Sequence, residues 1–325
     1  MDVSTVSRAL NDSPLVRDEV KAKIKRIAKR LNYVPNLAGF SLRTKMTKTI
    51  SLVFPYLKFP GGEFYDEISR GIDKIIEENK FSIILSDLSA KPINYSSFYR
   101  IISEGRIDGA IVVGDIFSES DLNKINQLKI PILLINQKID SKFKNIVNIF
   151  QNNAEGVKLV AEHLIKVHNR KNILFIGGGE RYQTSQEREK GFLETAVKYN
   201  VNYKIIQGAY DVASSGYKII EDLINKNEFN FDGIICGNDD IAFAVIKCLA
   251  DKKLLSKNIS VVGYDNIQAS KFFIPSLTTI DPCAYEMGEK AGELIIKWIL
   301  EKKMPSETRI EFLPKIVIRE SCGCF

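Results

Sequence analysis

The chain has 325 residues, of which 45% are hydrophobic and 26% charged, a composition that is typical of a folded globular protein and excludes a disordered or fibrous one. The length predicts two or three domains, at roughly 100–200 residues per domain. The 46 basic and 40 acidic residues give a net charge of +6, and the sequence shows neither a signal peptide nor a stretch of ~18 apolar residues, so we expect a cytoplasmic protein without a membrane partner.

The charge is unevenly divided along the chain. Residues 1–48 carry eleven basic and four acidic side chains, a net charge of +7, whereas the remaining 277 residues sum to −1. A small basic module joined to a nearly neutral body indicates a polyanionic partner for the front end. A solvated charged helix would explain the charge equally well, so the order of the residues has to decide.

The first predicted helix covers residues 3–10, with Asp2 as its N-cap. Val6 and Leu10 face inward, and the outer face is small, hydroxylated and ends in an arginine. Such a face suits the major groove of DNA, because hydroxyl and guanidinium groups bond to phosphates and base edges. The outer face consists of Val3, Ser4, Thr5, Ser7 and Arg8.

A second helix is predicted from about Arg17 to Leu31, with lysines and arginines along its outer face. Its apolar face is expected to be buried and consists of Val20, Ile24, Ile27, Ala28 and Leu31. Pro35 then interrupts the helix, and residues 36–44 are expected to form one short further helix before the first strand.

Three ordered blocks of this front end resemble the headpiece and hinge of the lactose-repressor/galactose-repressor (LacI/GalR) transcription factors. The blocks are Val3–Asn11, Leu31–Asn36 and Ser41–Thr44. The resemblance implies base contacts from some residues, contacts to the DNA backbone from others, and one leucine wedge in the minor groove. The implied base contacts are Val3, Ser4 and Arg8; the backbone contacts are Thr5, Ser7 and Asn11; and the wedge is Leu42.

Two departures from the family pattern stand out. The family begins with another helix, which crosses the DNA backbone, whereas this chain begins at the recognition helix. We therefore expect a helix-turn-helix that lacks its first helix and binds operator DNA poorly. Gly39 stands where the family usually has alanine and costs a helix about 1 kcal/mol, so the hinge helix should form reluctantly without DNA.

The rest of the chain alternates strand-like and helical runs, which predicts an α/β fold with parallel sheets flanked by helices. The strand-like runs are 49–56, 81–87, 109–115, 130–137 and 145–150, then 172–177, 203–208, 233–237, 259–264 and 277–281. The helical runs include 65–79, 153–168, 186–199, 241–251 and 285–302. Two groups of five strands predict two similar lobes with a cleft between them.

The resemblance implies the same architecture, a periplasmic-binding-protein-like core of two lobes. It implies that the chain crosses between the lobes near Gln151, near Asp281 and before a last strand over 312–319. The expected domains are a partial headpiece over 1–34, a hinge over 35–48, an N-terminal lobe over 49–150 plus 283–309, and a C-terminal lobe over 152–281 plus 311–325.

Ligands of such sheets bind beyond the carboxyl ends of the strands, where this sequence places aromatic and polar side chains. The candidate effector-binding residues are Phe64, Tyr65, Asn136, Arg188, Asn238 and Asp265. From the residues alone, core packing explains the two aromatic side chains, and helix capping explains Asn238 and Asp265 almost as well as binding does.

The resemblance puts Arg188, Asn238 and Asp265 at the family's effector positions, whereas Asn136 stands where sugar-responsive members often have aspartate. An aromatic face with forked donors and acceptors suits a small neutral sugar or sugar derivative, with a purine as the alternative. We expect no cofactor.

Other motifs are weaker. The run 177–179 is a plain turn rather than a phosphate loop, and no set of nucleophile, base and orienting group supports an enzyme. Cys322 and Cys324 are expected to lie in a surface tail, with redox sensing as a lesser hypothesis. No metal site is expected, because His163 and His168 are five residues apart on one helix and should point to different faces.

These observations predict a transcriptional regulator, a repressor of carbohydrate-metabolism genes, that binds pseudo-palindromic operator DNA as a homodimer and responds to a small effector. No heptad tail follows the last strand, so a tetramer is not expected. The alternative is a sugar-binding protein or sensor that does not touch DNA.

Overall fold

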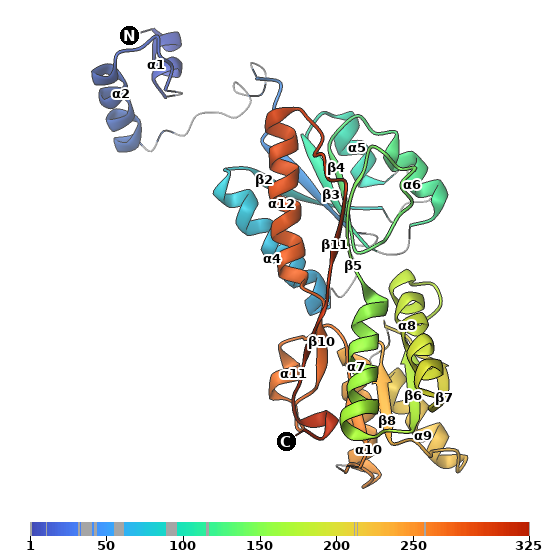
Figure 1. The fold of residues 1–325 in the computed structure, drawn as a ribbon. Coiled ribbons are helices and arrows are strands. Elements are labelled where there is room, and N and C mark those ends of the chain that lie inside the picture. The colour runs from blue at the N-terminus through green and yellow to red at the C-terminus, as the bar shows by residue number, and fades with distance from the viewer. Residues whose placement is uncertain are drawn as a thin grey trace. The chain divides into compact units, whose positions relative to one another are not determined.

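The structure is a computed structural model that divides into two compact units, Met1–Thr47 and Lys48–Phe325, called the headpiece and the core below (Figure 1). It describes residues 2–10, 12–31, 33, 41, 44–54, 62–88, 96–114, 117–210, 212, 214–256 and 258–324. Within these ranges, no helix is long and apolar enough to cross a membrane.

The headpiece contains α1 (Val3–Leu10) and α2 (Asp18–Arg30), which pack on a small apolar core. That core consists of Ala9, Val16 and Ile24, with Val6, Leu10 and Val20 around it. Ile27 and Leu31, which were predicted to be buried, are 38% and 67% exposed, because α1 covers only the first half of the apolar face of α2. The predicted hinge helix, with Gly39 and Leu42, lies largely outside the described residues.

The first lobe of the core is built on a six-stranded parallel sheet in the order β11-β5-β4-β3-β1-β2. Its strands are β1 (Thr49–Phe54), β2 (Ser82–Asp87), β3 (Gly109–Val113), β4 (Ile132–Ile135), β5 (Val147–Gln151) and β11 (Arg309–Phe312). The central strands β3, β4 and β5 are buried along their whole length, because helices cover both faces of the sheet. The covering helices are α4 (Glu63–Glu78), α5 (Ser97–Ser103), α6 (Glu119–Asn126) and α12 (Ala284–Glu301).

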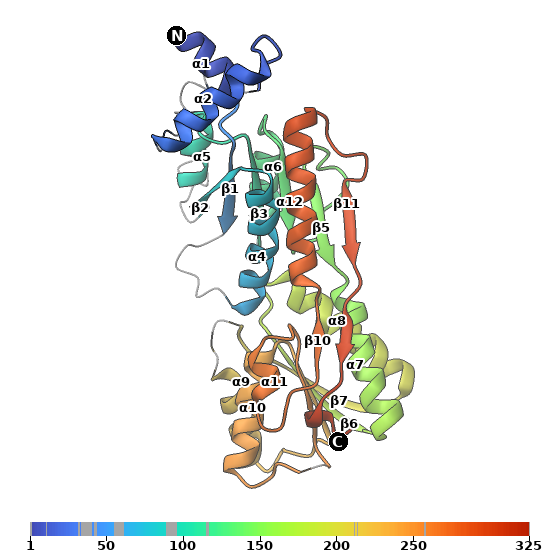
Figure 2. The ribbon, with the colours of Figure 1, turned by 90° about the vertical axis from the view of Figure 1, so that its left-hand side faces the viewer.

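Two glycines bring the backbones of α4 and α12 into contact, and the two helices lie side by side in both ribbon views (Figure 2). A Cβ atom on Gly71 would overlap the carbonyl oxygen of Tyr285, and a Cβ atom on Gly288 would overlap that of Ile68. The close approach therefore depends on the absence of a side chain at both positions.

The second lobe is built on a four-stranded parallel sheet in the order β7-β6-β8-β9. Its strands are β6 (Asn172–Gly177), β7 (Asn202–Gln207), β8 (Gly233–Cys236) and β9 (Ser260–Val262). Alternate residues of β6 belong to two separate apolar clusters, one shared with α7 and α8 and the other with α9 and α10. The helices of this lobe are α7 (Asn153–His168), α8 (Gln183–Tyr199), α9 (Ser215–Asn225), α10 (Asp239–Asp251) and α11 (Ala269–Phe272).

Three connections join the lobes: between β5 and α7, between β10 (Thr279–Asp281) and α12, and between β11 and β12 (Lys315–Val317). β10 and β12 pair as a two-stranded antiparallel sheet. The predicted fold class, an α/β core of two lobes with parallel sheets and a helical headpiece, is confirmed.

Two predictions about the strands are wrong. The expected five strands per lobe are six and four, because β11 adds to the first sheet and β10 leaves the second to pair with β12. The single strand predicted over 312–319 is two short strands, and β11 pairs with β5, so a lobe boundary between residues 309 and 311 falls inside β11. Leu313 and Pro314 separate the two strands, and Pro314 cannot donate to a ladder.

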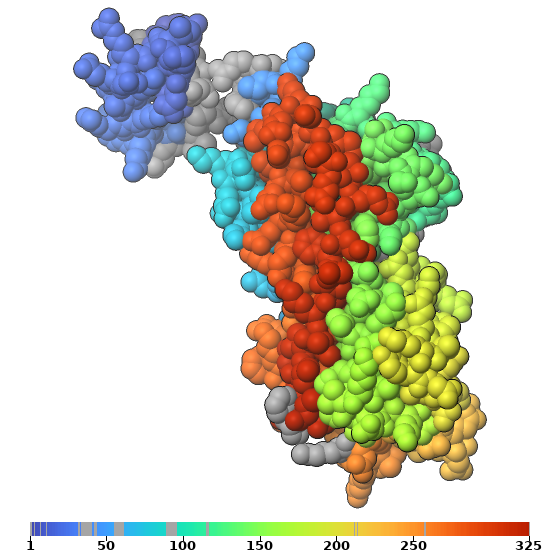
Figure 3. Space-filling model, viewed as in Figure 1, coloured from blue at the N-terminus to red at the C-terminus, as the bar shows by residue number. Residues whose placement is uncertain are grey.

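The C-terminal segment is not the surface tail that the sequence predicts. Cys322, at the end of the 3-10 helix η2 (Glu320–Cys322), is fully buried, and Cys324 is half-buried. The segment (red) lies along α7 (green) in the space-filling view (Figure 3). His163 and His168 do not point apart either: their ring centroids are 5.0 Å apart. Five residues turn a helix by about 140°, but His168 is the last residue of α7, and both rings reach the same tail.

Gly288→Ala is expected to destabilise the core by about 1–3 kcal/mol, because the new methyl group overlaps the backbone of α4 and the two helices must separate. This loss should exceed the gain of about 1 kcal/mol in helix propensity. Urea unfolding at constant pH measures it. Gly62→Ala is the matched control, since a Cβ atom there meets nothing within 4 Å. Unchanged or higher stability of Gly288→Ala would contradict the packing described here.

Candidate functional site

The candidate effector-binding residues lie beyond the carboxyl ends of strands in both lobes, where parallel sheets bind ligands. In the second lobe, Arg188 is in the first half of α8, Asn238 follows β8, and Asp265 lies three residues after β9. In the first lobe, Asn136 follows β4, and the two aromatic residues Phe64 and Tyr65 lie at the start of α4.

Arg188 is the centre of the second-lobe group. Its side chain is 5% exposed, and Cζ lies 3.5 Å from the centroid of the Tyr264 ring. Nε donates to Oδ1 of Asn153 at 3.0 Å, and Nη1 donates to the carbonyl oxygen of Gly237 and to the hydroxyl of Tyr210. A buried cation is costly unless it is hydrogen-bonded, so these partners hold the guanidinium in one orientation.

Asp265 supplies the counter-charge, with Oδ1 3.5 Å from Nη2 of Arg188. Burial raises the pKa of Asp265 to about 7, and the neighbouring guanidinium offsets part of that effect. The φ angle of 112° is one that favours glycine, and the backbone N–H donates to the carbonyl oxygen of Ile280 at 2.8 Å. The alternative of simple helix capping is wrong for this residue, because the next helix, α11, begins at Ala269.

Asn238 does cap a helix, as its alternative interpretation predicts: Oδ1 accepts the backbone N–H of Ile241 at 3.0 Å at the start of α10. The next residue, Asp239, is buried and accepts hydrogen bonds from the Thr279 hydroxyl and the Ile267 N–H. Burial raises its pKa well above the ordinary range. Since its own N–H donates to the carbonyl oxygen of Tyr264, α10 is tied directly to the segment that carries Asp265.

In the first lobe, Asn136 is held at the end of β4 by its neighbours on β5. Its N–H donates to the carbonyl oxygen of Ile149 at 3.0 Å, and Oδ1 accepts from Nε2 of Gln151 at 3.2 Å. Oε1 of Gln151 is buried and accepts no hydrogen bond from the residues that the structure describes. The carboxyl end of β5 thus holds a buried acceptor that the described residues leave without a hydrogen bond.

The two aromatic residues differ in burial. Phe64 is 8% exposed, which agrees with core packing, and Tyr65 is half-buried. Their rings meet edge to face with centroids 5.3 Å apart, and the Tyr65 ring also contacts Phe54 at 6.2 Å. The pair therefore forms one small aromatic cluster at the carboxyl end of β1.

A cavity of about 390 Å³ is lined by residues of both lobes, from the start of α4, from the loop after β9 and from the connection between β10 and α12. Two of the six candidate residues, Phe64 and Asp265, line it, and the other four do not. Beside it, the backbone N–H of Gln268 donates to the Glu63 carboxylate. The structure thus brings Arg188 next to Asp265, and Asp265 and Phe64 into one cavity.

Another pair of hydrogen bonds joins the lobes away from this cavity. The side-chain amide of Gln183, at the start of α8, accepts the N–H of Lys138 at 2.7 Å and donates to its carbonyl oxygen at 2.9 Å. Lys138 lies in the first lobe, three residues after β4. Both bonds connect the backbone of one lobe to a side chain of the other. They can therefore form only when the two lobes lie in this position relative to each other.

The headpiece presents part of its candidate DNA-binding face. Ser4 and Arg8 of α1 are exposed and Thr5 is half-buried, and the predicted Asp2 cap accepts the Thr5 N–H at 3.0 Å through its carbonyl oxygen. The remaining candidates lie outside what the structure describes. This holds for the side chains of Val3 and Ser7 and for the whole of Asn11 and Leu42.

Sequence reasoning missed several side chains of the Arg188 group, among them Tyr264 and Asn153. Tyr264 directly precedes the candidate Asp265, and its ring covers the guanidinium. Asn153 is the first residue of a helix that the sequence places correctly, and it also donates to Glu187 at 2.9 Å. Tyr264 and Asn153 both lie next to a strand or helix that the sequence predicts. Their contacts with Arg188 depend on the tertiary fold, which the sequence pattern does not show.

Asp265→Asn should flatten the dependence of stability on pH. The pKa of Asp265 is raised in the folded state, so its contribution to stability is present at low pH and is lost as pH rises from about 4 to about 7. The melting temperature of the unmutated protein should therefore fall, relative to that of Asp265→Asn, between about pH 4 and about pH 7. Glu301→Gln, at the exposed end of α12, is the control. Parallel profiles would show that Asp265 ionises normally.

Two protein-family models match parts of the chain. The model of the bacterial regulatory proteins of the lacI family matches residues 2–36, and the model of the periplasmic binding protein-like domain matches residues 161–322. The first match, over residues 2–36, does not show that a first helix is missing, so this expectation stays a prediction.

Individual relatives match over almost the whole chain. The HTH-type transcriptional regulator RegA of Clostridium saccharobutylicum is 29% identical over 99% of this chain and 96% of its own length. The HTH-type transcriptional repressor PurR of Actinobacillus pleuropneumoniae is 27% identical over 99% of this chain and 95% of its own. These relatives are transcriptional regulators and not enzymes.

Two solved structures share the fold. A Lac repressor dimer bound to operator and the anti-inducer ONPF superposes with a TM-score of 0.84 at 19% identity, over 98% of this chain and 94% of that one. A complex of the transcriptional regulator CelR with cellobiose gives 0.75 at 20% identity, over 98% and 95%.

The headpiece match argues against the alternative of a binding protein that does not touch DNA, and the two-lobed core agrees with the second family model. The chain therefore belongs to the LacI family: it is a helix-turn-helix transcriptional regulator with a periplasmic-binding-protein-like domain.

Proposed function

We propose that this LacI-family repressor acts in the cytoplasm as a homodimer on pseudo-palindromic operator DNA, and that a small effector bound in the cleft controls it. The observation that carries the effector proposal is the buried Arg188 with its partners Tyr264 and Asp265 at the carboxyl edge of the second sheet. The CelR–cellobiose complex and the Lac repressor dimer on operator support the sugar, the dimer and the DNA partner.

On the DNA side, we propose that α1 enters the major groove. Val3, Ser4 and Arg8 read base edges there, and Arg8 is the one long donor that the structure shows exposed on α1. Thr5, Ser7 and Asn11 contact the DNA backbone, and Leu42 from each protomer inserts into the minor groove at the centre of the operator.

The proposed effector is a small neutral sugar or sugar derivative. Asp265 accepts hydrogen bonds from adjacent hydroxyls beside Arg188, and Gln151 offers a buried acceptor from the opposite lobe beside Asn136. Phe64 and Tyr65 supply an aromatic face for the C–H side of a pyranose. Asn238 takes part through its amide nitrogen, because its oxygen caps α10. A purine remains the second candidate, since PurR proteins are among the relatives and a purine also stacks on aromatic rings.

The switch follows from the way in which the lobes are joined. Three connections and the Gln183–Lys138 bonds link them, so a ligand that contacts both lobes favours one relative position. The core continues through its first strand, β1, into the segment that precedes it, which is the proposed hinge. A shift of the first lobe then changes whether two hinge segments pair on DNA, which is a coupling free energy between the two sites.

Arg8→Ala should weaken operator binding by about 1–3 kcal/mol and relax base preference at one position of each half-site, because it removes a donor to a base edge. Arg26→Ala, on the exposed face of α2, is the matched control: if it matters at all, it should weaken binding to all sequences alike. Gel shifts at one salt concentration, with operators selected from a randomised palindromic library, measure both. If Arg8→Ala retains the full sequence preference, α1 is not the reading helix.

A panel of monosaccharides, disaccharides, sugar phosphates, hypoxanthine and guanine should contain a compound that raises the melting temperature of the protein. Asp265→Ala should abolish the shift, and Arg188→Lys should reduce it strongly, because each leaves a buried partner of the ligand unpaired at a cost of roughly 1–3 kcal/mol. Asp140→Asn, on an exposed loop of the first lobe, is the control.

The outcomes of this panel are distinct. A shift with purines alone assigns the cleft to the second candidate class. A sugar-induced shift that survives both Asp265→Ala and Arg188→Lys shows that the named residues are structural and that the ligand binds elsewhere.

A further inference from the structure

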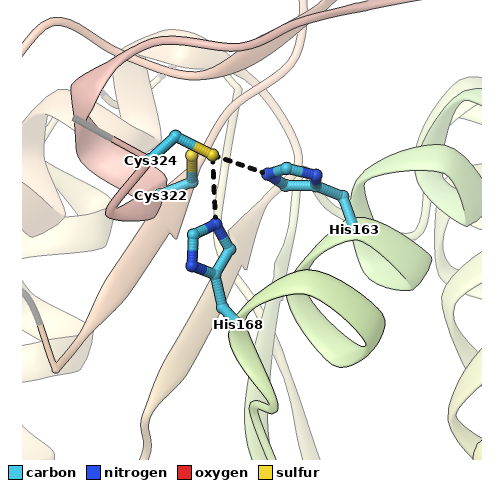
Figure 4. A group of neighbouring side chains, drawn as sticks. All are labelled: His163, His168, Cys322 and Cys324. Carbon is cyan, nitrogen blue, oxygen red and sulfur yellow. Dashed lines mark hydrogen bonds between the residues drawn. The ribbon is translucent and has the colours of Figure 1, made fainter.

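Four side chains that the proposed function does not use converge at the base of the second lobe (Figure 4). His163 and His168 come from the last turns of α7, Cys322 from the end of η2, and Cys324 from the residues after it. Each side chain offers one ligand atom, and the four atoms lie within 4.8 Å of one another. The two pairs are more than 150 residues apart in the sequence, so only the fold brings them together.

The two distances from Cys324 to the histidines fit a tetrahedral metal ion. Sγ of Cys324 lies 3.5 Å from Nε2 of His163 and 3.3 Å from Nε2 of His168. Zinc bonds of about 2.0–2.3 Å at tetrahedral angles place neighbouring ligand atoms about 3.3–3.8 Å apart. Both distances from the Cys324 sulfur to the histidine nitrogens lie in that range.

A thiol hydrogen bond explains the group less well. One S–H group has a single proton and is a weak donor, yet the Cys324 sulfur faces two imidazole nitrogens. Each imidazole offers one nitrogen lone pair to a metal ion. Two thiol sulfurs and two imidazoles form a ligand set that favours a soft divalent ion over Mg²⁺ or Ca²⁺.

We propose that His163, His168, Cys322 and Cys324 bind one Zn²⁺ ion per chain. Four protein ligands complete the coordination of zinc and leave no position for a reacting water, so the site is structural rather than catalytic. The fully buried Cys322 anchors it, because the Cys322 carbonyl oxygen also accepts a hydrogen bond from the Ser260 hydroxyl at 2.6 Å.

The ion would connect the C-terminal segment, through Cys322 and Cys324, to the two histidines of α7. That helix begins directly after the first connection between the lobes, and the C-terminal segment follows the third. Zinc that binds the folded chain and not the unfolded one raises the melting temperature by mass action. The zinc site is formed by these four residues whatever the effector is.

Zinc analysis of the full chain tests the proposal. The protein is prepared without an affinity tag, in a reducing buffer, and dialysed against Zn²⁺; since the sequence contains only two histidines, no other imidazole competes. We expect one zinc per chain, a higher melting temperature that a chelator reverses, and, with Co²⁺ in place of zinc, the intense visible spectrum of a tetrahedral ion with thiolate ligands.

Variants assign the ion to these residues. Cys324→Ser and His168→Ala should each lose the stoichiometric zinc and the thermal shift. Cys283→Ser is the matched control, because that cysteine lies outside the group, with Sγ 3.7 Å from the carbonyl oxygen of Leu313, and a serine hydroxyl can keep this contact. Zinc should also slow the alkylation of Cys324 in the unmutated protein, a readout that needs no variant to fold.

Three results would overturn the proposal: folded, fully reduced protein that takes up no zinc, stoichiometric zinc that persists in both folded ligand variants, or an alkylation rate of Cys324 that zinc does not change. A Co²⁺ spectrum without thiolate bands would likewise exclude the cysteines as ligands.

Discussion

A buried guanidinium organises the carboxyl edge of the second lobe. Arg188 cannot leave its charge unpaired in a low-dielectric setting, so the start of α7, the end of β8 and the loop after β9 each bring it a partner. The same requirement explains why Asp265 adopts an unfavourable φ angle there. The polar groups at this edge are therefore preorganised, and a ligand that binds there meets side chains that are already held in one orientation.

Strong periodic patterns made much of this fold predictable. The bounds of α7 and β6 agree with the sequence to the residue, because a sixteen-residue amphipathic helix and a buried apolar strand leave few alternatives. Short elements at sheet edges were missed. β11 and β12 have four and three residues, and their half-buried pattern does not reveal that they pair with different sheets.

The candidate site was predictable only in part, for a related reason. Residue type and position in the chain identified Arg188, Asn238 and Asp265 as candidates, but they did not reveal that each of the three has a different role. Asn238 caps a helix, Asp265 pairs with a cation, and Tyr264 covers that cation. In the same way, the spacing of His163 and His168 predicted that the two rings would not meet the same partner. Only the path of the C-terminal segment shows that both lie next to Cys324.

The bonds between Gln183 and Lys138 have a genetic consequence. Because both bonds use the backbone of residue 138, any amino acid except proline can stand there and preserve them, whereas the other end needs a side-chain amide at residue 183. The two ends of this contact therefore differ in how a substitution affects it. A substitution of Lys138 removes the contact of its ammonium group with the Phe150 ring, 5.2 Å from the centroid, but leaves both bonds between the lobes in place. A single codon change at residue 183 removes both bonds and so alters how readily the lobes separate.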